Sequence, residues 1–201
     1  MDNTLTVKEA LPSFYKQYQL DADGGVNDNT VKIKLFKGVY VYIPNVEARK
    51  KVVLKHDMHH LVTGYTGVMK GETEISAWEI STGCSNNMAA FVINTLGMMM
   101  GVLFNLRGIW KAWYRGRYTR NLYYVKYTED ELLGRTIQSL QEELGLLNNP
   151  KQMPGRGKAF LLFAGFLLFG TIISIISLAL SPLILLYSLY IFLSRKLWKK
   201  N

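Results

Sequence analysis

The stretch LKHDMHHLV at residues 54–62 decides how this chain of 201 residues is organised, because it joins a helical apolar pattern to every histidine of the protein. Its apolar residues recur at helical spacing, so we predict an amphipathic helix whose inward face carries Leu54, Met58, Leu61 and Val62. On that helix His56 and His60 are four positions apart and share one face, with Asp57 on its flank. Histidines with unrelated structural roles would not be expected to crowd together, so the stretch points to a site.

A carboxylate follows this stretch at Glu72, with eleven residues between it and His60. Two imidazoles and two carboxylates form a mixed nitrogen and oxygen donor set that suits zinc or another first-row divalent ion. We therefore predict a divalent metal site with His56, Asp57, His60 and Glu72 as ligands. Zinc is favoured, and another first-row metal or magnesium is the alternative. A helix cap or a solvated polar face remains as the simpler interpretation.

The spacing H-D-x2-H-x11-E resembles the metal motif of the coenzyme Q (ubiquinone) biosynthesis protein 4 family. Further elements resemble that family as well: HLVTGY at 60–65, GE at 71–72, AWYRGR at 112–117 and LQEELGL at 140–146. The resemblance covers about residues 46–147, which is about half of the chain. The first 45 residues and the hydrophobic tail after residue 158 depart from the family pattern.

The resemblance implies a membrane-bound protein of ubiquinone biosynthesis that binds a divalent metal ion and a polyprenyl lipid. It also implies that the protein joins other quinone-biosynthesis proteins in a complex. The family is linked to removal of the ring carboxylate from a prenylated hydroxybenzoate with replacement by oxygen, so a metal-dependent oxidative decarboxylase is the expected activity. The alternative is a non-catalytic lipid-binding scaffold that organises a quinone or other prenyl-lipid biosynthesis complex. A homo-oligomer is compatible with both.

The distribution of charge along the chain limits the kinds of molecule that it is expected to bind. The formal net charge is +9, and the basic residues cluster at 107–126, 151–158 and 195–200. Basic residues interleaved with aromatic ones can bind nucleic acid, but here they flank very apolar segments, which favours anionic lipid headgroups over nucleic acid. The candidate headgroup-binding residues are Arg107, Arg115, Arg117 and Arg120. The single cysteine, Cys84, excludes an intramolecular disulfide, and no N-terminal signal peptide is visible.

The pattern along the chain predicts a mostly helical, all-α fold with a small N-terminal β-hairpin. Residues 1–45 form an N-terminal segment with a helix over 1–20 and a hairpin over 31–43 around Lys37-Gly38. Residues 46–147 form the helical metal-binding domain, residues 148–158 a linker and residues 159–201 a membrane anchor.

Within the helical domain, the first helix ends near Thr63 and a second begins near Gly71. Glu79 shares a face with Glu72, so it is a speculative catalytic base or a group that supports the metal, with a solvated surface glutamate as the alternative. The apolar run 88–106 is expected to be a buried helix that lines a lipid-accepting groove, with plain core packing as the alternative. Residues 107–147 are expected to form two further helices.

The tail has no charged residue from Ala159 to Leu193. A helix of that length would measure about 50 Å, against about 30 Å for the hydrocarbon core of a bilayer. Because Ser181-Pro182 interrupts the run and basic residues flank both ends, we expect a transmembrane or re-entrant helical hairpin. A single crossing is the alternative. The expected location is a membrane, the inner membrane in a bacterium, with the main domain on the cytoplasmic side.

Overall fold

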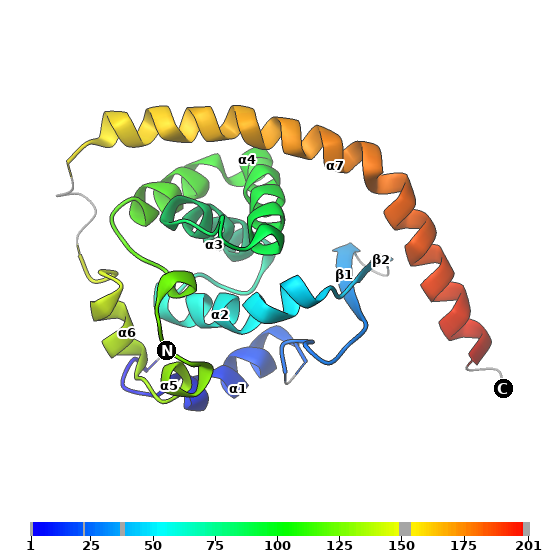
Figure 1. The fold of residues 1–201 in the computed structure, drawn as a ribbon, viewed down its shortest axis with the longest axis horizontal. Helices are drawn as coiled ribbons and strands as arrows, with labels where there is room; N and C mark the ends of the chain where they lie inside the picture. Colours follow the sequence, from blue (N-terminus) through cyan, green and yellow to red (C-terminus); the bar gives the residue numbers. More distant parts are fainter. Residues whose placement is uncertain (1, 22, 37–38, 149–153, 199–201) are drawn as a thin grey trace.

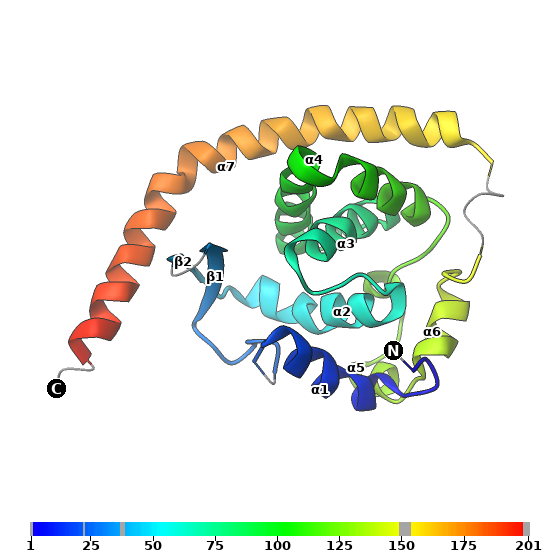
Figure 2. The same cartoon turned by 180° about the vertical axis from the view of Figure 1, so that it is seen from behind.

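The computed structural model of the protein describes residues 2–21, 23–36, 39–148 and 154–198. Over these residues the chain forms seven α-helices, one short 3-10 helix and a two-stranded antiparallel sheet. This confirms the predicted fold class. Figure 1 shows the helices α1 to α6 gathered into one body, with the long helix α7 curving around it, and Figure 2 shows the same arrangement from behind.

The N-terminal segment has the predicted helix and hairpin. Helix α1 (Val7–Tyr18) begins at a capping box, in which the Thr6 side chain accepts from the backbone of Glu9 while the Glu9 carboxylate accepts from the backbone of Thr6. Strand β1 (Thr30–Phe36) pairs antiparallel with β2 (Val39–Pro44). The turn expected at Lys37-Gly38 lies outside the described residues.

The two helices predicted to carry the site are both present. Helix α2 (Glu47–Thr63) ends where Gly64 adopts a left-handed conformation, with φ of 77°, which glycine tolerates without a steric penalty. Helix α3 (Met69–Thr82) follows after a short loop. The C-terminal half of α2 is buried on nearly every side, so its histidines are held inside the body.

Helix α4 (Met88–Gly116) folds back around α3. The backbone leaves helical geometry at Asn105, whose side-chain amide donates to Glu74 of α3 at 2.9 Å. Asn105 divides α4 into two arms, and glycines let both of them approach α3 closely. A Cβ at Gly101 would lie 2.6 Å from the Cβ of Thr73, and one at Gly116 would lie 2.8 Å from the carbonyl oxygen of Trp78. The structure therefore holds α4 against the body.

This helix agrees with the sequence expectation in one respect and differs in another. Its helical geometry is interrupted at Asn105, close to the predicted end near Leu106, and a second helical arm then continues to Gly116. It differs in that it is only partly buried, since Leu103 is 85% exposed and Phe104 is 55% exposed. The sequence predicts two further helices over residues 107–147. The described residues of this range hold the second arm of α4, the 3-10 helix η1 (Leu122–Tyr124), α5 (Glu129–Leu133) and α6 (Ile137–Glu143).

The hydrophobic tail is a single helix, α7 (Arg156–Trp198), and the predicted hairpin is wrong. Pro182 lies inside α7, where its ring removes one backbone hydrogen bond and favours a bend. Figure 1 shows a curve in this region and no reversal of the chain. By length and composition, both α4 and α7 are apolar enough to cross a membrane.

Candidate metal centre

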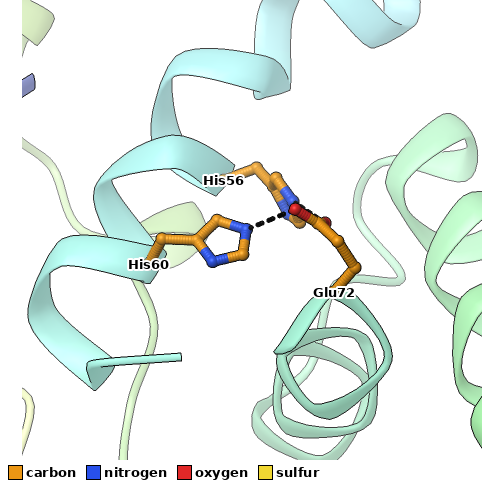
Figure 3. Close-up of side chains that lie close together, drawn as sticks. All are labelled: His56, His60 and Glu72. Atoms are coloured by element: carbon orange, nitrogen blue, oxygen red, sulfur yellow. Dashed lines mark hydrogen bonds and ion pairs between the residues drawn. The ribbon is translucent and has the colours of Figure 1, made fainter. Parts of the chain in front are cut away.

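The predicted metal site lies between α2 and α3 and brings together three of its four predicted ligands. His56 and His60 project from successive turns of α2 toward Glu72 in the first turn of α3, as Figure 3 shows. The Nε2 atom of His56 lies 3.4 Å from Glu72 Oε2, and the Nε2 atom of His60 lies 3.3 Å from Glu72 Oε1. One ligand atom from each residue lies within 4.8 Å of the others, so this group can hold a metal ion.

Hydrogen bonds on the far side of each ring fix the direction of both histidines. The Nδ1 atom of His60 is 2.9 Å from the carbonyl oxygen of Tyr65, and that of His56 is 2.9 Å from Glu79 Oε1. Because both partners are acceptors, each Nδ1 carries a proton. The Nε2 atom of each ring faces Glu72, and in a neutral imidazole it presents a lone pair there. The Nε2 atom of His60 is buried and has no hydrogen-bond partner within the described part of the chain. An unpaired buried lone pair beside a carboxylate suits a cation.

Asp57, the fourth predicted ligand, is turned away from this group. Its Oδ2 atom accepts a hydrogen bond at 2.9 Å from the hydroxyl of Tyr15 in α1. The loop before the hairpin also packs here, since a Cβ at Gly24 would lie 2.8 Å from the same oxygen. Burial raises the pKa of Asp57 above its ordinary value. Adjacent helical positions point about 100° apart, so the step from His56 to Asp57 carries this carboxylate toward α1, which it joins to α2.

A second cluster surrounds the fully buried Glu79 directly behind His56. Its Oε1 atom accepts from Nδ1 of His56 at 2.9 Å and from Nδ1 of His59 at 2.6 Å. Its Oε2 atom accepts from the hydroxyl of Tyr123 at 2.8 Å and from the side-chain amide of Asn94. Glu79 is 0% exposed, so the surface interpretation of this residue is wrong. Four donors on two oxygens occupy the acceptor capacity of a carboxylate, which suits a residue that positions His56.

The third histidine of the stretch, His59, links α2 to the rest of the body. Its Nε2 atom accepts from the backbone N–H of Leu122 at 2.9 Å. Nε2 is therefore unprotonated, and the proton on Nδ1 is donated to Glu79. His59 is 0% exposed and packs edge-on against Trp78. With both ring nitrogens occupied, His59 is a structural residue of the core.

The charges of this region depend on one another. Burial alone would raise the pKa of Glu79, but His56 and His59 outweigh it and hold that pKa well below its ordinary value. Burial alone would lower the pKa of His56, but the carboxylates of Glu79 and Glu72 raise it well above its ordinary value. Burial lowers the pKa of His59. The structure therefore places a charged His56 between two carboxylates in the metal-free protein.

The four arginines predicted to bind headgroups do not form one site. Three of them donate to backbone carbonyls: Arg115 to Thr63, Arg117 to Ser81 and Arg120 to Glu143. The guanidinium of Arg115 also lies over the ring of Tyr65, so it braces the turn whose carbonyl fixes His60. Arg107 is exposed on α4. Arg120 also lines a cavity of about 500 Å³ beside η1, at residues separate from the metal group.

No protein-family model, curated protein or solved structure matches this chain. The resemblance to the coenzyme Q biosynthesis protein 4 family therefore stays a prediction drawn from the motif. What the structure adds is the geometry of a candidate metal centre with three ligands from two helices.

Proposed function

We propose that this chain is a membrane-associated metal-binding protein of prenylated quinone biosynthesis, which acts on or presents a prenylated aromatic acid. The observation that carries the proposal is the group of His56, His60 and Glu72, in which a buried imidazole nitrogen has no hydrogen-bond partner within the described residues. The long apolar helix α7 supports the membrane part of the proposal. The sequence motif supports the substrate class.

In this proposal His56, His60 and Glu72 hold a divalent ion. Zinc suits two imidazoles and a carboxylate, and three protein ligands leave a coordination position open. Such an ion supplies a Lewis acid that polarises a ring carboxylate or phenolate and stabilises negative charge. The Glu72 side chain is 41% exposed, so the open side of the centre is beside Glu72, and a substrate reaches it from there. Tyr65 and Glu79 keep the two rings turned toward that side.

The metal content of the protein purified in detergent tests this proposal. Mass spectrometry is expected to find about one divalent ion per chain in the wild type. The ion is expected to be lost from the Glu72→Gln variant. Glu74→Gln is the matched control, because Glu74 lies on the same helix and binds Asn105 instead of the histidines. A folded wild type without metal, or a folded Glu72→Gln variant that keeps its ion, would contradict the proposal.

A non-catalytic scaffold is the second candidate, and one observation favours it. The acceptor capacity of Glu79 and both ring nitrogens of His59 are occupied by hydrogen bonds, so neither residue offers a base. Turnover of a prenylated hydroxybenzoate by the pure, metal-loaded protein separates the two candidates. Product formed by the pure protein indicates an enzyme. Product formed only when other quinone-biosynthesis proteins are added indicates a scaffold.

A further inference from the structure

The long apolar helix α7 is attached to the body near both of its ends. Near its start, the indole N–H of Trp113 donates to the carbonyl oxygen of Ala159 at 3.2 Å, and Phe163 packs against the same indole. Toward its other end, the hydroxyl of Ser188 accepts from the backbone N–H of Tyr42 in β2 at 2.9 Å. Ser188 is only 7% exposed. The hairpin that holds Ser188 is tied to the body by the chain itself, because Asn45 and Val46 alone separate β2 from α2.

The distance between these contacts decides how α7 can meet a bilayer. Ala159 and Ser188 are 29 positions apart, which corresponds to about 44 Å along a helix. The hydrocarbon core of a bilayer is about 30 Å thick. A crossing that begins at Ala159 would therefore place Ser188 beyond the opposite surface. The hairpin that binds Ser188 would have to follow it there, away from the α2 helix to which it is joined.

The two faces of α7 have different surroundings. One face is covered by the body at Ala159, Phe163, Gly170 and Ser188. The opposite face carries large side chains at helical spacing, and each of these residues is between 58% and 73% exposed. They are Leu161, Leu168, Ile172, Ile175, Leu183, Leu186 and Tyr190. A continuous exposed apolar face of this length indicates a binding surface.

The charge pattern identifies the partner of this face. Arg156 and Lys158 precede the uncharged run, and Arg195, Lys196, Lys199 and Lys200 follow it in the sequence. Basic residues at both ends of an apolar helix complement the anionic headgroups of phospholipids, which attract Lys and Arg. A lipid leaflet therefore satisfies both the apolar face and the charged ends.

We propose that α7 lies in the plane of one leaflet that contains anionic lipid, and that it does not cross the bilayer. Figure 1 shows α7 curved around the body, so its exposed face is the convex one. The middle of the helix, around Ile175, then enters the leaflet most deeply, to about 5–10 Å. The basic ends remain at the level of the headgroups. The body then lies entirely on one side of the membrane, and this topology does not depend on the metal centre.

Single cysteines placed along α7 test this proposal in the full-length protein. Gly157→Cys and Ser194→Cys mark the two ends of the helix, and both are labelled in sealed, uniformly oriented membrane vesicles with a maleimide that does not cross membranes. The wild type is the control, because Cys84 is fully buried and burial raises its pKa to about 12. Labelling of both ends from the same side is the expected result. Labelling from opposite sides overturns the proposal.

Depth and partner are tested with Ile175→Cys carrying a fluorophore. Lipids brominated on their acyl chains are expected to quench the fluorophore at least twofold more strongly at Ile175 than at Gly157. Equal quenching at both positions overturns the proposal. The proposal is also overturned if the protein stays in solution as a dimer and does not float with vesicles of phosphatidylcholine and phosphatidylglycerol. Metal content measured on the same samples keeps a failure of the proposed metal centre distinct from a failure of this topology.

Discussion

Replacing Glu79 by glutamine tests whether this buried carboxylate positions the metal centre. A glutamine has nearly the same shape, but one carboxylate oxygen becomes an amide group that donates. The oxygen that remains can accept from His56 and His59. The new amide then faces Asn94 and Tyr123, which at present both donate to Glu79.

The size of the effect follows from these bonds. Two hydrogen bonds to a charged acceptor are lost, each worth about 1.5–3 kcal/mol, and a rotated Tyr123 hydroxyl or a flipped Asn94 amide recovers part of this. We expect a net loss of about 3 kcal/mol in the free energy of unfolding. For a chain of this size, that loss lowers Tm by about 6–12 °C. The metal dissociation constant is expected to rise by about 10–100-fold, as is typical when the hydrogen-bond partner of a metal-binding histidine is mutated.

Circular dichroism during heating in detergent measures the first effect, and competition with a coloured chelator measures the second. The Glu74→Gln variant is the control for loss of a carboxylate from the same helix. If Glu79→Gln keeps the Tm of the wild type within 2 °C, the buried carboxylate does not stabilise the core. If it remains folded and binds metal as tightly as the wild type, Glu79 does not position His56.

Three further predictions follow from the packing and the charges. A Cβ at Gly101 would press on Thr73 and Ile109, so Gly101→Ala is expected to lower the free energy of unfolding by about 1–3 kcal/mol in thermal melts. The control Gly165→Ala, whose Cβ would meet nothing within 4 Å, is expected to lose none. The pKa of Glu79 is lowered in the folded state. The wild type is therefore expected to exceed Glu79→Gln in free energy of unfolding by the full amount above about pH 4.3, and by less as the pH falls toward the folded-state pKa. A difference in unfolding free energy that grows in acid would contradict the lowered pKa of Glu79. Divalent metal at 100 times its dissociation constant is expected to stabilise the wild type by about 2.7 kcal/mol in denaturant titrations, and a similar gain in Glu72→Gln would place the ion elsewhere.

Helical periodicity predicted the part of the site that depends on one helix. His56 and His60 are neighbours because four positions make nearly one full turn, and Glu72 was identified by its spacing from them. Periodicity alone does not distinguish His59 from His60, since positions three and four along a helix both lie near His56. The H-D-x2-H-x11-E spacing selected His60 as the ligand. The roles of His59 and His60 differ because Leu122, more than sixty positions away, donates to the ring of His59. Such a contact has no local pattern in the sequence.

The residues that sequence reasoning missed are those that meet the site from other elements. Tyr123 follows a loop and Asn94 lies within an apolar run, so neither has a spacing that marks it as a partner of Glu79. Tyr15 withdraws Asp57 from the ligand group in the same way. The predicted hairpin at the tail failed for a different reason. The pair Ser181-Pro182 predicts an interruption of the helix, but a proline inside a helix can bend it without ending it, and α7 continues through Pro182.

The enclosure of α3 by the two arms of α4 has a consequence for the order in which the protein assembles. All contacts between these helices lie within residues 69–116, and contacts that are close in sequence form fastest. We expect this segment to fold first as one cooperative unit, with Glu72, Glu79 and Asn94 already in their relative places. His56, His59 and His60 arrive afterwards, when α2 docks. Formation of the metal centre would then report that the N-terminal half of the chain has reached its final position.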